Sequence, residues 1–169
     1  MFIASWFMPW WQAWIVYLKE TAIQIRPWGA DSFLPPEYAA AVSGYEMPDW
    51  FAPFMWAYFA VCITALLYGM FVSNSERIGV GKLSVSPAGL VGLVGLTYLL
   101  CVVVALIVMQ TRMAGFYNAP LIGTIYIALD EGHKSNVDTM LLPGYYLAAA
   151  TGPVLAILSL LHRFIVGKT

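Results

Sequence analysis

Three uncharged apolar runs alternate with polar segments along this chain. Residues 50–72, 88–109 and 140–161 each hold 22 or 23 positions without a single Asp, Glu, Lys, Arg or His. At about 1.5 Å of rise per residue, a helix of roughly 20 residues crosses the hydrocarbon layer of a bilayer. The pattern therefore predicts an all-α integral membrane protein, a single bundle with three transmembrane helices.

The first segment, 1–18, is also apolar, but it is shorter and contains Pro9. Four of its residues between positions 6 and 14 are Trp, which prefers the headgroup level of a membrane. We therefore expect a Trp-rich N-terminal helix that either lies in the interface or makes a fourth crossing. A cleaved signal peptide is disfavoured, because no basic residue precedes the apolar run and no small-residue cleavage site follows it before Lys19.

Two longer connections separate these apolar segments. Residues 19–49 are polar and rich in Pro and Gly, which predicts a structured loop outside the membrane. Residues 110–139 are expected to form a second outer loop, although 113–129 are nearly as apolar as a span. Pro120 interrupts that stretch, and only three residues separate it from the preceding run, so we expect a segment partly embedded in the membrane or covered by protein.

The distribution of charge predicts an orientation. The short linker 73–87 and the tail 162–169 lie on one side of the membrane if three helices cross, and they hold half of the eight basic residues. The two longer loops hold eight of the nine acidic residues. The positive-inside rule therefore places the linker and the C-terminus in the cytoplasm, as in a multi-pass protein of a cytoplasmic or inner membrane. The formal net charge of −1 and the lack of a basic patch argue against nucleic-acid binding.

Small residues recur at helical spacing in two of the apolar runs. Because helices in lipid associate through close van der Waals contact, small residues three or four apart mark packing faces. The predicted helix-packing positions are Ala88, Gly92 and Gly95 in the second run and Ala148, Gly152 and Ala156 in the third.

One cluster in the second loop has the residue types of a metal site. Asp130, His133 and Asp138 offer carboxylate and imidazole ligands of the kind that hard or borderline metals accept. However, Lys134 lies among them, the chain supplies only one nitrogen ligand there, and no recognised spacing is matched. A solvated acidic turn is the alternative.

The function is predicted mainly from the expected location of the chain in a membrane. Ionisable groups at membrane depth usually mark ion or proton paths, and the three runs contain none. We therefore expect a non-catalytic membrane subunit, not itself an enzyme, that packs against and stabilises larger membrane subunits, with an energy-converting oxidoreductase or monooxygenase complex as its host. The expected partners are these subunits and lipid. No cofactor is expected within the chain, although a metal, quinone or pigment shared with a partner is compatible with this role.

Two alternative functions stay open. One is a small homo-oligomeric transporter or channel built around the glycine-bearing helices. The other is a membrane enzyme with a metal or quinone site at the outer face near His133.

Overall fold

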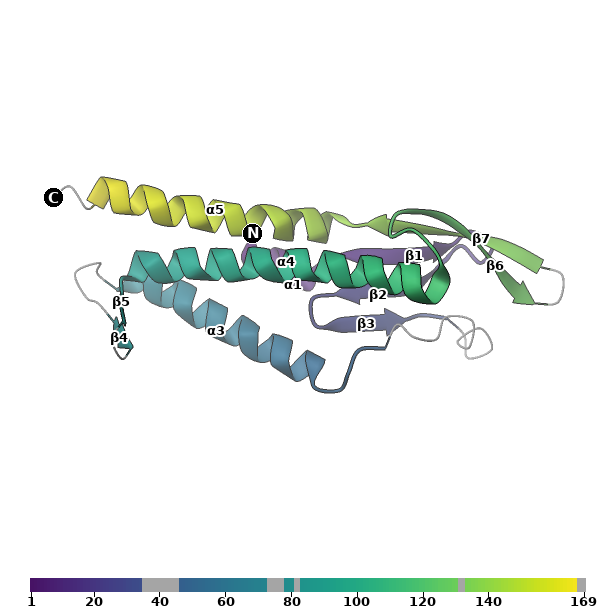
Figure 1. Cartoon of the computed structure of the whole chain (residues 1–169), viewed down its shortest axis with the longest axis horizontal. Coiled ribbons are helices and arrows are strands. Elements are labelled where there is room, and N and C mark those ends of the chain that lie inside the picture. The colour runs from purple at the N-terminus through teal and green to yellow at the C-terminus, as the bar shows by residue number, and fades with distance from the viewer. Residues whose placement is uncertain (35–45, 73–77, 81–82, 131–132, 167–169) are drawn as a thin grey trace.

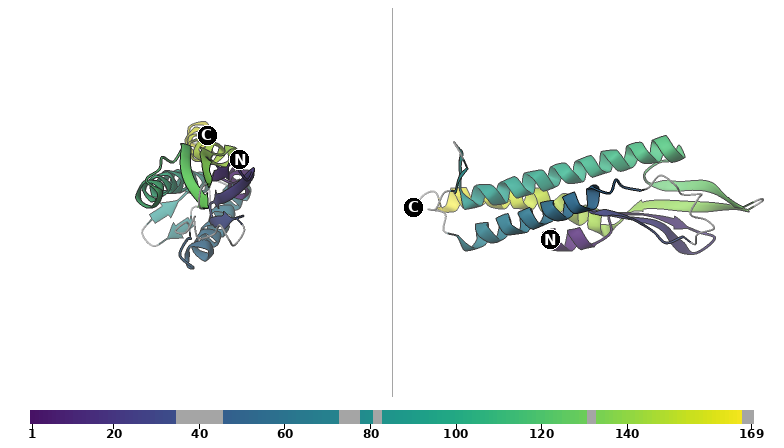
Figure 2. Two further views of the ribbon diagram at one scale, coloured as in Figure 1. Left: turned by 90° about the vertical axis from the view of Figure 1, so that its right-hand side faces the viewer. Right: turned by 90° about the horizontal axis from the view of Figure 1, so that it is seen from below.

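The chain folds into an elongated molecule with helices at one end and a sheet at the other (Figure 1). The computed structural model describes residues 1–34, 46–72, 78–80, 83–130 and 133–166. Three long helices run alongside one another: α3 (Phe51–Phe71), α4 (Pro87–Tyr117) and α5 (Pro143–Val166). Seen from a second direction, helices and sheet still follow one another along the long axis (Figure 2).

The three helices correspond to the three predicted spans. Phe51–Phe71, Pro87–Gly115 and Pro143–His162 are each long and apolar enough to cross a membrane, which indicates an integral membrane protein. The start of α4 is well defined, since the Ser86 hydroxyl accepts a hydrogen bond from the Gly89 amide at 3.1 Å and Pro87 occupies the first turn. Its end is equally clear, because Asn118 adopts a left-handed conformation with φ of 46°.

The prediction of an all-α fold is wrong, because the described residues include an antiparallel sheet of five strands in the order β3-β2-β1-β7-β6. The fold is therefore mixed α/β. A separate two-stranded hairpin lies at the opposite end of the helices (Figure 1). The strands are β1 (Trp11–Ile15), β2 (Glu20–Arg26), β3 (Gly29–Ser32), β6 (Gly123–Asp130) and β7 (His133–Leu141) in the sheet, and β4 (Ile78–Val80) and β5 (Leu83–Val85) in the hairpin.

The N-terminal segment does not form the expected helix over 1–18. The helix α1 (Phe2–Phe7) ends before Pro9, because a residue that precedes proline is pushed out of the helical region, and Met8 is indeed extended with ψ of 143°. After the proline the chain continues as strand β1, in which buried and partly buried residues alternate. Trp6 therefore belongs to a helix and Trp11 and Trp14 to a strand, so these side chains follow two different periods along the chain.

The second long connection is also a different structure from the expected loop. Its apolar stretch, 113–129, is divided between the last turn of α4 and the edge strand β6. The following strand, β7, shows the alternation of a half-buried strand, with Ser135, Val137 and Thr139 buried and the residues between them more exposed. Pairing of β7 with β6 satisfies the backbone groups that an embedded loop would leave without partners.

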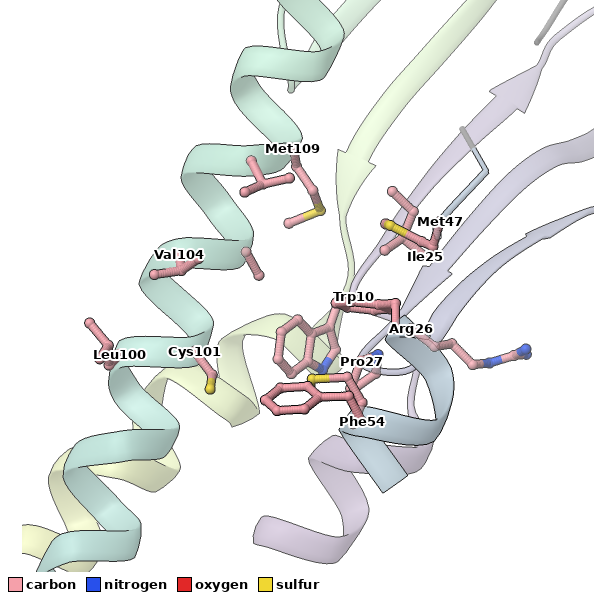
Figure 3. Close-up of a pocket in the computed structure, with 14 residues that line it drawn as sticks. Trp10, Ile25, Arg26, Pro27, Met47, Phe54, Leu100, Cys101, Val104 and Met109 are labelled. Carbon is pink, nitrogen blue, oxygen red and sulfur yellow. The ribbon is translucent and has the colours of Figure 1, made fainter. Parts of the chain in front are cut away.

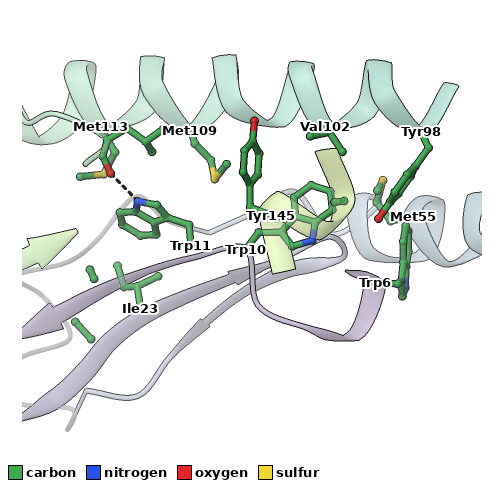
Figure 4. Packing of buried hydrophobic residues seen from close by; sticks show 14 of the residues in the cluster. Trp6, Trp10, Trp11, Ile23, Met55, Tyr98, Val102, Met109, Met113 and Tyr145 are labelled. Carbon is green, nitrogen blue, oxygen red and sulfur yellow. Dashed lines mark hydrogen bonds between the residues drawn. The ribbon is translucent and has the colours of Figure 1, made fainter. Parts of the chain in front are cut away.

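The core lies where the sheet meets the helices (Figure 4). There the indole N–H of Trp10 donates to the Ser5 carbonyl, and the indole N–H of Trp11 donates to the Leu121 carbonyl, both at 2.8 Å. The hydroxyls of Ser5 and Tyr98 are also hydrogen-bonded at 2.8 Å. These bonds fix the N-terminal segment against α4 and the chain that follows it.

Close packing joins α4 to α5. A Cβ atom added to Gly95 would lie 2.7 Å from the Gly152 carbonyl oxygen, and one added to Gly152 would lie 2.7 Å from the Leu99 Cβ. At the far end, the Ser159 hydroxyl donates to the Ala88 carbonyl at 2.6 Å and lies 2.6 Å from a Cβ position on Gly92. In the same interface, Ala148 is completely buried, and the Ala156 amide nitrogen lies 3.0 Å from the Gly95 Cβ position.

We expect Gly152→Ala to lower the free energy of unfolding by about 1–3 kcal/mol, because the new methyl group would displace backbone of the neighbouring helix. Titration of detergent-solubilised protein with sodium dodecyl sulfate, followed by circular dichroism, measures this change. Gly115→Ala in α4 is the control, since a Cβ there has nothing within 4 Å. Equal stability of the two variants would show that the α4–α5 contact is not tight.

Candidate functional site

An apolar cleft of about 300 Å³ lies between α3 and α4 beside the sheet (Figure 3). One wall is the first turn of α3, with Phe51, Phe54 and Met55, and the other is α4 over residues 100–109. The end nearest the sheet is formed by the Trp10 ring and by the end of β2. Its volume is at the lower end of the range typical of ligand pockets, about 300–1,000 Å³.

The cleft exists because α3 and α4 diverge toward the sheet (Figure 1). Near the hairpin the two helices touch, since a Cβ on Gly69 would lie 2.6 Å from Cγ2 of Val91. Further along, the hydroxyls of Tyr58 and Thr97 are hydrogen-bonded at 3.1 Å. Beyond this bond the helices separate, and the cleft opens.

Large aromatic side chains hold α3 away from the rest of the bundle. Trp6 of α1 is completely buried, and its ring stacks on Phe59 of α3 with centroids 4.7 Å apart. Phe2 packs between the same Phe59, at 5.6 Å, and Tyr98 of α4, at 4.7 Å. The rings of Phe2 and Trp6 therefore form an aromatic wedge against α3, with Phe2 reaching α4 as well, whereas glycine permits close contact on the α5 side of α4.

Arg26 lies at the end of the cleft, but its guanidinium points away from the cavity (Figure 3). The guanidinium forms an ion pair with Asp31, donates from Nη2 to the Gln24 side-chain oxygen at 3.1 Å, and has its Cζ 6.0 Å from the centroid of the Trp28 ring. The charge of Arg26 is therefore on the Gln24 side of β2, and the cleft itself is apolar.

The sheet has two different faces. Toward the core it presents buried apolar side chains, among them Trp11, Ile15 and Val137. The register places a second set on the opposite side, because Gln12 pairs with Gln24, Trp14 with Asp138, and Asp138 with Thr124. We define the open face as the following side chains of that second set: Gln12, Trp14, Gln24, Thr124, Tyr126 and Asp138.

The predicted metal ligands are not all close to one another along the sheet. Asp130 and His133 pair with each other at the far end of β6 and β7, and their side chains lie outside the described residues. Asp138 lies five residues further along β7, about 17 Å away at the usual rise of a strand. Its carboxylate accepts a hydrogen bond from the Thr124 hydroxyl at 2.6 Å.

Among the side chains that the structure describes, no three His, Cys, Asp or Glu residues are placed to hold a metal ion. The metal site near His133 and the expectation that the chain itself holds no cofactor both stay predictions. The two cysteines, Cys62 and Cys101, are free, and Cys101 lines the cleft.

The sequence did not reveal the cleft or the open face. Trp6, which packs against α3, was visible in the Trp-rich first segment, but the Trp residues there were interpreted as lying at the headgroup level of the membrane. The open face required the strand register, which hydropathy does not give.

Comparison with known proteins adds no relative. The chain matches no protein-family model, no curated protein and no solved structure.

We expect Trp6→Ala to lower the free energy of unfolding by about 3–5 kcal/mol, because it removes a fully buried ring that stacks on Phe59 of α3. Unfolding in sodium dodecyl sulfate, followed by circular dichroism, reports the loss. Trp6→Phe is the control and should cost much less. It keeps an aromatic ring, and the indole N–H that it removes has no acceptor within the described residues. Equal losses in the two variants would contradict the role of the ring as a wedge.

Proposed function

We propose that the protein is a non-catalytic membrane subunit that uses the open face of its sheet to bind a larger subunit of a membrane complex. The observation that carries this proposal is the two-sided sheet. One face is buried against the core, while the other presents amide, carboxylate and aromatic side chains that no described element covers. Aromatic residues that bury large areas at low entropic cost are enriched at protein interfaces.

The edge of the sheet supports the same proposal. β6 lies at the end of the strand order, so one side of its backbone has no neighbouring strand among the described residues. Tyr126 on this strand is 75% exposed, and Ile122 just before it is 56% exposed. Soluble proteins usually protect such edges, and exposed apolar side chains beside free backbone groups favour contact with another chain.

The proposed orientation has the sheet outside the cell. The β4–β5 hairpin and the end of α5 lie together at the end of the molecule opposite the sheet (Figure 1), and the segments 73–87 and 162–169 hold half of the basic residues. The positive-inside rule therefore supports a cytoplasmic hairpin and C-terminus. The host complex, expected from sequence to be an oxidoreductase or monooxygenase, stays a prediction.

Orientation is tested by labelling intact cells with a membrane-impermeant maleimide. We expect Asn136→Cys, on an exposed position of β7, to be labelled before lysis. A cysteine appended after Thr169 should be labelled only after lysis. The reverse pattern would show that the sheet faces the cytoplasm. Cys62 and Cys101 are replaced by Ala in both variants, so that neither of these free thiols can be labelled.

The partner surface is tested with Tyr126→Ala. We expect the affinity for the co-purifying subunit to fall about tenfold or more, the effect of losing about 1.4–2 kcal/mol at an interface tyrosine. Gentle detergent extraction, size separation and mass spectrometry of co-migrating chains measure retention. Tyr146→Ala is the matched control, because this tyrosine is also exposed but lies on α5.

Two outcomes of that experiment would contradict the proposal. Equal retention of the partner by both variants would exclude the open face as the contact surface. Migration of the wild-type chain alone, or only with copies of itself, would exclude an accessory role. The homo-oligomeric transporter would then become the leading function, with uptake into liposomes as its assay.

A further inference from the structure

The length of the α3–α4 cleft along the helix axis is close to the thickness of one leaflet of a bilayer. Along α4 it extends from Leu100 to Met109, which is about 14 Å of helix. The hydrocarbon layer is about 30 Å thick, so the cleft covers roughly half of it. Its inner limit is the hydrogen bond between Tyr58 and Thr97, and its outer end lies beside Phe51, where α3 begins.

The walls of this cleft require an apolar occupant. Phe54, Leu100 and Val104 line it with hydrocarbon surface. A buried water needs two to four polar partners, which such walls do not offer. An empty space would leave the lining atoms without dispersion contacts on one side. Within a membrane, hydrocarbon is therefore the natural filling.

The dimensions distinguish a lipid chain from a helix. The cleft is about 14 Å long, which is the extent of one leaflet. An acyl chain occupies one leaflet, whereas a transmembrane helix spans both and is about 10 Å wide with its side chains. A transmembrane helix would also need space in the other leaflet, where Gly69 of α3 and Val91 of α4 are in contact.

Positive charge at the outer end suits a phosphate group. Arg112 lies on α4 one turn beyond the cleft and donates to the Glu46 carbonyl at 3.2 Å. Within the described ranges it has no carboxylate at ion-pair distance. Guanidinium groups bind phosphate oxygens through charge-assisted hydrogen bonds.

We propose that this cleft binds one glycerophospholipid molecule, with an acyl chain between α3 and α4 and the phosphate beside Arg112. The site is independent of the partner surface on the sheet, since it lies between membrane helices and uses none of the side chains that bind a partner there. Its occupant completes the packing that the aromatic wedge leaves open.

The test uses the full chain, delipidated in detergent micelles and titrated with dioleoylphosphatidylcholine. Native mass spectrometry reports the number of bound lipids. We expect saturation at one lipid per chain, and at least tenfold weaker binding for Ala105→Phe, which fills the cleft. Ala114→Phe is the matched control, because Ala114 is exposed on the same helix and does not line the cleft. Its binding should equal that of the wild type.

A second variant tests the headgroup without filling the cavity. We expect Arg112→Gln to weaken phosphatidylcholine binding severalfold but to leave the binding of oleyl alcohol, which has a chain and no phosphate, unchanged. Equal weakening for both lipids would overturn the assignment of the phosphate to Arg112.

Other outcomes would overturn the proposal as a whole. Lipid binding by the wild type that does not saturate at one, or that Ala105→Phe leaves unchanged, would identify ordinary boundary lipid. The wild-type titration gives this answer even if Ala105→Phe fails to fold. Release of a co-purifying protein by Ala105→Phe, with phosphatidylcholine binding unchanged, would assign the cleft to a partner chain instead.

Discussion

Antiparallel pairing between β1 and β7 joins two segments that lie more than 120 residues apart in the chain, from Trp11 with Leu141 to Ile15 with Val137. At the end of this ladder the Leu142 amide donates to the Trp10 carbonyl at 2.8 Å, just before α5 begins. Gly144 lies directly against the Pro9 carbonyl, and a side chain at this position would force the strands and the helix apart. The pairing therefore fixes the N-terminal segment at the start of a membrane helix.

The position of β1 in turn determines the helical part. Because β1 is fixed beside α5, the preceding residues place α1 against α5, where the Ser5 hydroxyl meets the Tyr98 hydroxyl and Trp6 meets Phe59. Aromatic rings on that side of α4 keep α3 at a distance, while Gly95 and Gly152 bring α5 into backbone contact. Helix α4 therefore packs closely against α5 and less closely against α3, and the cleft lies on the α3 side.

The membrane helices could be predicted from the sequence because lipid imposes a strict requirement on length and charge, which the three uncharged runs satisfy. The sheet was missed for two physical reasons. β1 is only five residues long and follows α1 after a single proline, so its period of two was hidden within an apolar segment. In addition, its partner β7 is distant in sequence, and the backbone pairing that stabilises both strands leaves no local pattern. The β-branched residues in 123–127 and the alternation in 135–139 were the available strand signals, but the apolar character of the first stretch favoured an embedded loop.

The candidate sites depend on relations between elements that hydropathy does not encode. Each membrane helix is apolar all round, so its sequence does not show which side meets lipid and which meets protein. The end of β2 shows how much this matters, because Gln24 belongs to the open face while its neighbour Ile25 lines the cleft. A strand with period two that ends beside the membrane helices therefore contributes to both surfaces through adjacent residues. The proposed lipid site and the proposed partner surface thus meet at β2 without sharing a side chain.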